Sequence, residues 1–421
     1  MKILQMLCGA GLTALCFNVA AAIADLPQAA QIESLLANHL LVQNAGSSLL
    51  QELANQRNWN SGNYEFNLRA GSAQRNIVST GQKLTEWDIA LERPLRLYNK
   101  VGMDADIGAA SVARAEYALG DARHEAGRTL LQLWFSWLRE TAQSSLWQQQ
   151  QEILTQQAQM VEKRFKAGDA PRLEWNQALA AAAQAGVSEL QAKLRLDLAA
   201  HELRNQFPTI VLPANVQAAD PQEVGHDFAY WKTGVLEHDH GLGMAEAHSQ
   251  VQKLLAQRSL ADRVPDPTVG VRYSSETGGL EKVAGVYVSV PLSFGLRSAL
   301  ADAALQQAAI AADREAFARR QLEGEIYATH SRAVNGYATW QQAYAAAKAM
   351  RNNAELTAKA YSLGENSLSD SLLARRSALE AALTESLARL DANEARYRLL
   401  LDAHQLWPLD NRADDHHASH Y

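Results

Sequence analysis

Two long stretches without proline set the main limit on the fold of this chain. All ten prolines lie outside residues 95–170 and 292–407, and both stretches are rich in Ala, Gln, Leu and Glu. Proline inside a helix costs about 3 kcal/mol or more, so its absence favours long helices. A helix of about 60 residues is about 90 Å long at 1.5 Å per residue. Such a rod cannot fold into a compact globule and must pack against equally long helices.

Each proline-free stretch has one glycine break. Gly168 lies in the segment 165–171, and Gly364 lies in the segment 361–368. Glycine past a helix end, followed by residues that can cap the next helix, predicts a tight helix–helix turn. Ser367 with Asp370 three residues on resembles a capping box. A plain kink at either glycine is the alternative interpretation.

Four short segments alternate apolar and polar residues with a period of two, which predicts strands. They cover residues 64–70, 86–92, 268–274 and 285–290. In a membrane barrel the apolar face contacts lipid and the other face lines a wet lumen. A half-buried sheet of a soluble protein shows the same alternation, so the pattern alone leaves both open.

The N-terminal residues resemble an export signal. Lys2 is followed by an apolar stretch over residues 3–19 and by Ala22-Ile23-Ala24, an A-x-A cleavage pattern. A membrane anchor is the alternative. Both cysteines, Cys8 and Cys16, lie in this segment, so we expect no disulfide and no thiol metal site in the mature chain. Leu15 precedes Cys16 where lipid-modified sites need a small residue, and we expect no N-terminal lipid.

The chain reads as two similar halves. Pro94-Leu95 corresponds to Pro291-Leu292, and Gly168 corresponds to Gly364. Each half runs strand, strand, Pro-Leu, long helix, glycine turn, second long helix. We therefore predict a signal peptide (1–24), a first repeat (25–213), a linker (214–245), a second repeat (246–408) and a flexible His-rich tail (409–421). Four strands cannot close a membrane barrel, whereas three chains would supply twelve.

The order of these elements resembles the TolC family of outer membrane factors. Val290-Pro291-Leu292-Ser293-Phe294-Gly295 is similar to the family's strand-to-helix junction. Tyr361-Ser362-Leu363-Gly364, with Asp370 six residues after the glycine, is similar to its helix–turn–helix tip. Each motif is weak alone, and the order and repeat spacing carry the resemblance.

The resemblance implies a mainly helical fold with a small β part. Long α-helical hairpins would form a periplasmic tunnel, and two β-hairpins would give four strands to a trimeric twelve-stranded outer-membrane barrel. It implies a homotrimer in outer-membrane lipid that meets a periplasmic adaptor and an inner-membrane pump of RND type. The function implied is conduction of substrates to the outside, with no cofactor and no chemistry.

The resemblance also assigns candidate residues at the tips. Asp370 matches a position in the family's acidic ring, which narrows the closed pore. Tyr361 matches a gate tyrosine, and Glu174 matches a polar partner position in the first turn. Three symmetry-related carboxylates would attract cations. The alternative for Asp370 is that it only caps the helix. The alternative for Tyr361 and Glu174 is that they only pack against neighbours or lie on the solvated surface. Phe165, Gly168 and Gly364 are expected to form the turns and to meet the adaptor.

Histidines gather around the linker and in the tail. The linker region has His226, His238, His240 and His248, and the tail has His416, His417 and His420. Imidazole and carboxylate together can bind Zn²⁺, Cu²⁺ or Ni²⁺, but this spacing fits no closed structural site. We predict a flexible polar linker and tail and no metal-ligating residues, and weak metal interaction is the alternative. The chain's length resembles the cation-efflux branch associated with heavy-metal pumps.

Three other classes of protein are alternatives to the channel. The sequence has no G-x-S-x-G motif, no H-E-x-x-H motif and no phosphate-binding glycine loop. We therefore expect that the protein is not an enzyme. The formal net charge of −7 gives no reason for nucleic-acid binding. A periplasmic coiled-coil adaptor or scaffold would share the export signal and the helical hairpins, but it would not need two β-hairpins.

Overall fold

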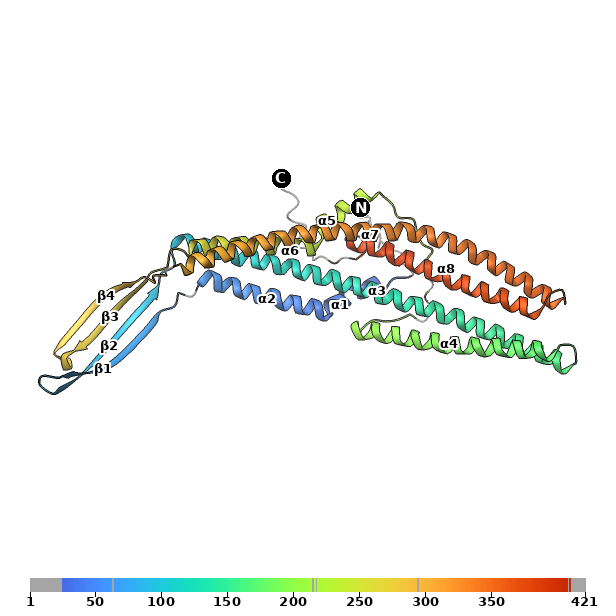
Figure 1. Cartoon of the computed structure of the whole chain (residues 1–421), viewed down its shortest axis with the longest axis horizontal. Helices are drawn as coiled ribbons and strands as arrows, with labels where there is room; N and C mark the ends of the chain where they lie inside the picture. The colour runs from blue at the N-terminus through green and yellow to red at the C-terminus, as the bar shows by residue number, and fades with distance from the viewer. Residues whose placement is uncertain are drawn as a thin grey trace, which may run out of the picture.

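The chain forms an elongated rod of helices with a four-stranded sheet at one end (Figure 1). The computed structural model describes residues 25–62, 64–213, 216, 218–293, 295–407 and 409. The predicted export signal lies outside the described residues, and of the predicted tail only Leu409 is described. None of the described helices combines the length and the apolar character that crossing a membrane requires.

Eight helices are described, and the two longest begin just after the sheet. The bounds are α1 Ala29–Ala37, α2 Leu40–Ser61, α3 Tyr98–Lys166, α4 Arg172–Gln206, α5 Phe228–His238, α6 His240–Ala261, α7 Leu296–Ser362 and α8 Leu368–Asp402. The 69 residues of α3 extend over about 100 Å at 1.5 Å per residue. The proline-free stretches therefore form long helices, as predicted. Helix α5 and the start of α6 lie within the stretch predicted as a linker.

The long helices pack as two hairpins. Helix α3 packs against α4, and α7 packs against α8, while α3 also contacts α8. Nearer the sheet, α2 lies along α3, and α6 lies between α3 and α7 (Figure 1). Small residues allow this close approach, since Ala185, Ala192, Ala301 and Ala333 are each at most 3% exposed. The alanine-rich composition thus determines how near the axes of these helices come to one another.

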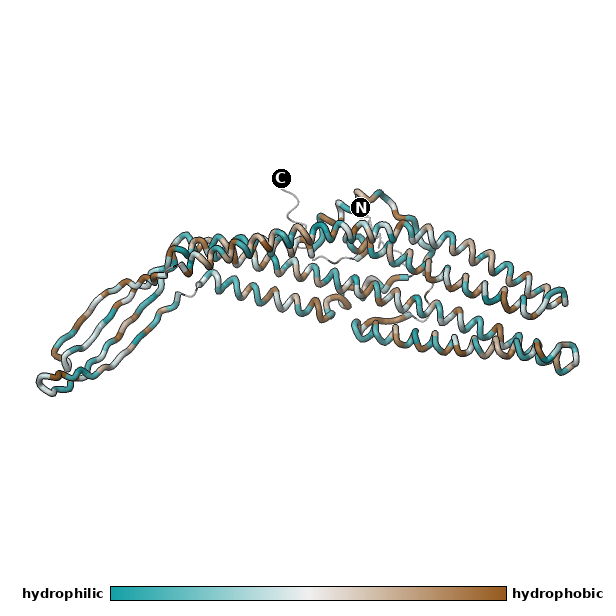
Figure 2. The backbone as a smooth tube through the Cα atoms, in the orientation of Figure 1, coloured by the Kyte–Doolittle hydropathy of each residue, from teal (hydrophilic) through white to brown (hydrophobic). Residues whose placement is uncertain are grey.

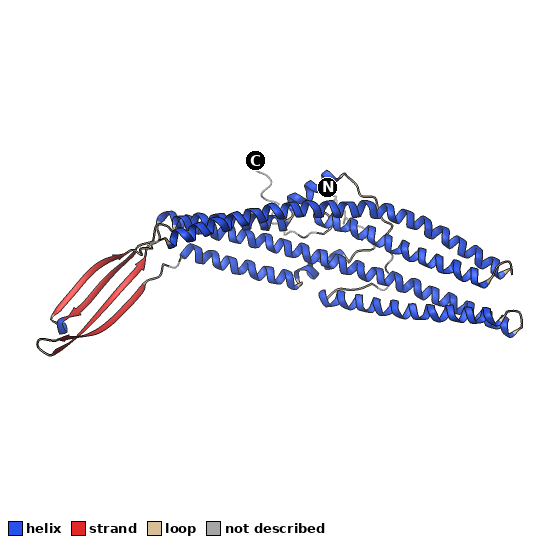
Figure 3. Cartoon of the chain, in the orientation of Figure 1, coloured by secondary structure: helices blue, strands red, loops and turns tan. Residues whose placement is uncertain are grey.

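The two β-hairpins join into one antiparallel sheet of order β1-β2-β3-β4 (Figure 3). The strands are β1 Asn67–Ile77, β2 Gln82–Pro94, β3 Thr268–Glu276 and β4 Glu281–Ser289. Strand β2 pairs with β3 across the two halves of the chain, with Ile89 opposite Tyr273. Within the described residues, β1 and β4 each lack a partner on their outer side. An unpaired edge presents a row of backbone hydrogen-bonding groups that can pair with another strand.

One face of this sheet is apolar, and its side chains are exposed. Cross-strand partners place Leu91 beside Leu68 and Val271, and Val271 beside Val286. Val286 is 85% exposed and Leu68 is 72% exposed. The opposite face carries the charged side chains Arg69, Asp88, Glu92 and Arg272, and the alternation is visible along the strands in Figure 2. The predicted period of two is confirmed.

The predicted strand boundaries were too wide at two ends. Strand β1 begins at Asn67, so Tyr64 and Phe66 precede it, and Val290 follows the end of β4. Tyr64 instead joins the polar junction between sheet and helices, where its hydroxyl donates to Asp266 Oδ2 at 3.1 Å. A side chain that serves this junction can share the alternating pattern by chance, which explains the error.

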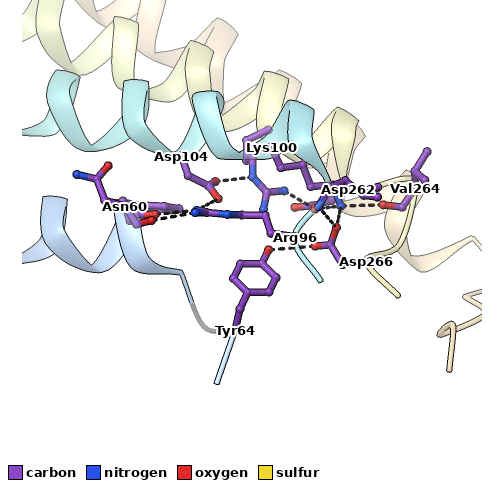
Figure 4. Close-up of polar contacts among 11 residues, drawn as sticks. Asn60, Tyr64, Arg96, Lys100, Asp104, Asp262, Val264 and Asp266 are labelled. Carbon is purple, nitrogen blue, oxygen red and sulfur yellow. Dashed lines mark hydrogen bonds and ion pairs between the residues drawn. The ribbon is translucent and has the colours of Figure 1, made fainter. Parts of the chain in front are cut away.

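The junction between the sheet and the rod is a buried network of ion pairs (Figure 4). Lys100, which is fully buried, contacts Asp262 at 2.9 Å and Asp266 at 3.0 Å, and its Nζ also donates to the carbonyl of Val264. Arg96 contacts Asp104 at 3.0 Å. Every charge in this group therefore has a partner, as burial requires. The network links the start of α3 to the segment between α6 and β3.

The largest apolar core lies in the middle of the rod. It joins α1, α3, the end of α4 and the end of α8, and includes Leu35, Leu130, Trp134, Phe135, Leu203, Phe207 and Leu401. Trp134 Nε1–H donates to the carbonyl of Asp25 at 2.9 Å. Asp25 also accepts hydrogen bonds from Tyr397 and Asn393 on α8. The first described residues are thereby attached to both long hairpins.

Candidate functional site

The two helical hairpins end in turns of the same geometry at the end of the rod far from the sheet (Figure 1). After α3, Gly168 has φ +80°, and Asp169 N–H donates to Arg164 O at 2.8 Å. After α7, Gly364 has φ +78°, and Glu365 N–H donates to Ala360 O at 2.9 Å. A left-handed residue with this bond reverses the chain after a helix, and glycine adopts it without strain. Both breaks are turns, and the kink interpretation is wrong.

A polar network connects the two tips. The Tyr361 hydroxyl donates to Glu174 Oε2 at 3.2 Å, and Arg164 Nη1 donates to the same hydroxyl at 3.1 Å. Arg164 Nε also donates to Asp169 Oδ2 at 3.1 Å, and its guanidinium lies 5.7 Å from the Tyr361 ring centre. Tyr361 on α7 thus contacts side chains from α3 and α4.

The environment keeps the Tyr361 phenol neutral. Burial raises its pKa, and the neighbouring Glu174 carboxylate raises it further, while Arg164 acts in the opposite direction. The hydrogen bond to Asp169 raises the pKa of Arg164, so the guanidinium keeps its charge. At neutral pH the phenol therefore remains a donor to Glu174 and an acceptor from Arg164.

Apolar contacts support the network from beneath. Leu368, the first residue of α8, is 1% exposed and packs with Val161 of α3 and Ala178 of α4. Phe165 stacks on Trp175 with ring centres 5.1 Å apart and planes at 12°. Burial of Leu368 between α3 and α4 couples the second tip to the first, because the two hairpins cannot part without exposing it.

Asp370 occupies the first turn of α8 and remains exposed. The Ser367 hydroxyl donates to Asp370 Oδ2 at 2.7 Å and accepts from the Asp370 N–H at 3.1 Å. The Ser367 cap is therefore present, with the carboxylate at the positive end of the helix dipole. The capping box is only half formed, because the Ser367 N–H donates to Asn366 Oδ1.

Of the six candidate residues, the structure brings Tyr361 and Glu174 into direct contact. It places Gly168 and Gly364 in the turns and Phe165 in the last helical turn of α3. The sequence reasoning missed Arg164, Asp169 and Trp175. Arg164 and Asp169 flank the Gly168 turn, so a charged pair five residues apart around a predicted turn was an available signal. The sequence carries no comparable signal for Trp175, because its stacking on Phe165 follows only from the folded turn.

One group of potential metal ligands lies away from the tips. His124, His240 and His404 each direct a ring nitrogen to within 4.8 Å of the other two. The sequence analysis predicted no metal-ligating residues, because the spacing of the linker and tail histidines fits no closed site, and it did not consider His124 or His404. Among the residues described at the tips, no such group of three ligands is found.

The comparisons with known proteins agree with this architecture. Residues 32–206 match the family model described as outer membrane efflux protein. No curated protein matches the chain. The CmeC outer membrane channel of Campylobacter jejuni is 16% identical, with a TM-score of 0.75 over 89% of this chain and 85% of that one.

Two further solved structures have the same fold. The outer membrane protein VceC of Vibrio cholerae is 15% identical, with a TM-score of 0.69 over 91% of this chain and 99% of that one. CusC, which forms a transmembrane channel, is 14% identical, with a TM-score of 0.69 over 89% of this chain and 92% of that one. At this identity the structures show the shared fold, and the family model adds the sequence relationship. Residues 32–206 are therefore similar to the outer membrane efflux protein family, and the described chain has the fold of solved outer membrane channels.

Proposed function

We propose that three copies of this chain close one twelve-stranded barrel and one helical tunnel, and that the trimer conducts cargo from a periplasmic adaptor and an inner-membrane pump of RND type. The observation that carries the proposal is the sheet. It has two unpaired edges and one exposed apolar face in the described chain. Pairing β1 of one copy with β4 of the next removes every edge, which a membrane requires.

The strand lengths fit a bilayer. Strands β1 and β2 have 11 and 13 residues, and β3 and β4 have 9 each. A strand that crosses a bilayer at a tilt needs about 9–11 residues. The apolar face would contact lipid, and the face with Arg69, Asp88 and Arg272 would line water.

At the other end of the rod we propose a gate. Tyr361, Glu174 and Arg164 hold the second tip against the first, and Asp370 of each copy faces the pore as a ring of three carboxylates. Phe165, Gly168 and Gly364 form the surface that the adaptor contacts. Opening then requires the α7–α8 hairpin to move away from α3–α4, which breaks the bonds of the Tyr361 hydroxyl.

For cargo we propose heavy-metal cations as the first class to test. The support is the exposed Asp370 carboxylate, which three copies would arrange as a ring, together with Glu237, His238 and Asp239. Cells that lack their own channel would be supplied with this chain, the adaptor and the pump. Export of Zn²⁺ or Cu²⁺ would then be compared with export of an organic drug. Drug export without metal export would contradict this part and leave the channel intact.

Cysteine cross-linking tests the trimer directly. After replacement of Cys8 and Cys16 by Ala, one cysteine would replace Ala70 on β1 and a second would be placed in turn along β4, at Val283, Gly285 and Tyr287 and at the intervening positions. Edge pairing predicts a covalent ladder that ends at three chains. The matched control moves the first cysteine to Ile89 on β2, which already has partners on both sides.

The cross-linking result is read together with membrane fractionation. The expected product is an outer-membrane species of three chains whose ladder depends on β1 and β4. Equal cross-linking from Ile89, or a monomer released from the periplasm, would refute the trimeric barrel.

A further inference from the structure

Three histidines from distant parts of the chain converge in the middle part of the rod. His124 lies on α3, His240 is the first residue of α6, and His404 follows the end of α8. The ring centres of His124 and His404 are 4.1 Å apart, and His240 lies 5.4 Å and 5.3 Å from them. One nitrogen of each ring lies within 4.8 Å of the other two.

The backbone of α3 makes room for one of these rings. Gly120 precedes His124 by one helical turn, and a Cβ atom at this position would lie 2.7 Å from the ring of His240. Any other residue at position 120 would force the His240 ring to shift. The close approach of α6 to α3 at this point therefore depends on glycine.

His404 adopts a backbone conformation that glycine adopts more easily. Its φ is +57°, and the next residue, Gln405, donates its N–H to Leu400 O at 2.8 Å. This is the same chain reversal that Gly168 and Gly364 make at the tips. A left-handed histidine is strained relative to glycine, and such strain is often found at functional sites.

An ion pair beside the histidines fixes the end of α8 on α3. Arg128, one turn after His124, donates its Nε–H to Asp402 Oδ1 at 2.9 Å. Arg398 donates to the same carboxylate. Because Asp402 is two residues before His404, this pair holds the His404 backbone against α3.

The ligand set selects a class of metal. Imidazole nitrogen suits Zn²⁺, Cu²⁺ and Ni²⁺, whereas Mg²⁺ and Ca²⁺ take oxygen ligands. Zinc–nitrogen bonds of about 2.0–2.1 Å place tetrahedral ligand atoms about 3.4 Å apart, so the separations between the three nitrogens need to shorten by at most about 1.4 Å to complete the site. His124 is 5% exposed and the other two are half-buried, which leaves one side open for a fourth ligand.

Carboxylates surround His240. An added Cβ on the next residue, Gly241, would lie 3.2 Å from Oδ1 of both Asp121 and Asp239. Carboxylates beside ligating imidazoles orient the rings and offset the charge of the metal. The geometry points to a resident site for one divalent transition-metal ion, Zn²⁺ first, held by His124, His240 and His404. The ion would join α6 and the segment after α8 to α3, independently of the proposed cargo.

The test uses the full mature chain, purified in detergent through a tag without histidine and stripped with a chelator. His416, His417 and His420 are replaced by Ala in every variant, which removes tail binding from the measurement. Zn²⁺ uptake is measured by equilibrium dialysis with metal analysis. We expect one tight Zn²⁺ per chain and visible absorption bands of tetrahedral cobalt when Co²⁺ replaces it.

Two ligand variants and one control assign the site. His240→Gln and His404→Gln should each weaken Zn²⁺ binding at least tenfold, whereas His201→Gln, at an exposed position on α4, should leave it unchanged. Zn²⁺ should raise the melting temperature of the control and not that of the ligand variants.

His404→Gly separates a ligand from a folding defect. Glycine suits φ +57°, so the metal-free variant should melt at or above the temperature of the metal-free parent and still lose tight Zn²⁺ binding. Unchanged affinity in His404→Gln and His404→Gly, or Zn²⁺ binding only at millimolar concentration, would overturn the proposal. Neither result would affect the trimer, because cross-linking from β1 to β4 reports on that separately.

Discussion

The Tyr361 hydroxyl donates a 3.2 Å hydrogen bond to the Glu174 carboxylate, which joins the tip of the second helical hairpin to that of the first. The same oxygen accepts from Arg164 at 3.1 Å. One hydroxyl group therefore connects an acid on α4 with a base on α3. This contact gives the proposed gate a specific bond that must break when the tips separate.

Removal of that hydroxyl should favour the open channel. Tyr361→Phe keeps the ring packed against the apolar cluster that contains Leu368 but leaves Glu174 and Arg164 without their common partner, at a cost of about 1 kcal/mol per chain to the closed state. This corresponds to about a fivefold shift toward opening per chain. Single-channel conductance in planar bilayers should rise, and cells should become sensitive to antibiotics too large for the closed pore.

A tyrosine elsewhere on the same helix serves as the control. Tyr327 is 63% exposed on α7, and Tyr327→Phe should leave conductance unchanged. Equal leakage from both variants would show that the phenol at the tip has no special part in closure.

Asp370 allows the pore charge to be separated from the helix cap. Asp370→Asn removes the charge but can still accept from the Ser367 hydroxyl, so the start of α8 should persist. We expect reversal potentials to show reduced preference for cations. Ser367→Ala keeps the charge but loses the cap, at about 1 kcal/mol, and should lower thermal stability while selectivity stays the same. If Asp370→Asn alters stability alone, Asp370 is only a cap.

The buried ammonium of Lys100 should be essential at the junction. Lys100→Met leaves Asp262 and Asp266 without their shared cation, and removal of one partner from a buried pair costs about 3 kcal/mol. We expect a melting temperature lower by several degrees and less trimer in the outer membrane. Lys193→Met is the matched control, because Lys193 is 51% exposed on α4 and pairs only along its own helix. Equal melting temperatures for the two variants would contradict a stabilising role of the network.

The phenol of Tyr64 should lose its proton at a higher pH than an ordinary tyrosine. Burial, followed by the charge and hydrogen bond of Asp266, raises its pKa to about 12. The folded state therefore holds this proton more tightly than the unfolded state, whose tyrosine titrates near 10. Stability from this group is complete below about pH 10 and is lost as pH rises toward 12.

Ultraviolet absorbance of tyrosinate measures this directly. Tyr64→Phe should remove one transition near pH 12 from the titration of the folded protein. It should also flatten the fall in stability between pH 10 and 12. A Tyr64 transition near pH 10 would show that the phenol does not bond to Asp266 in solution.

Much of the fold could be predicted from local sequence, because its causes are local. Missing prolines predict α3 and α7, Gly168 and Gly364 predict the turns, and alternation predicts the strands to within a few residues. The cap formed by Ser367 and Asp370 belongs to the same class, since both partners lie within one helical turn.

The remaining features depend on which surfaces meet. Pairing of β2 with β3, contact of Tyr361 with Glu174, burial of Lys100 and convergence of the three histidines all join segments distant in the chain. Local periodicity states which face of an element is apolar but not which neighbour covers it. The long helices, the turns and the strands therefore follow from local sequence. The polar contacts follow from the packing of the long helices, because this packing brings side chains from distant segments within bonding distance.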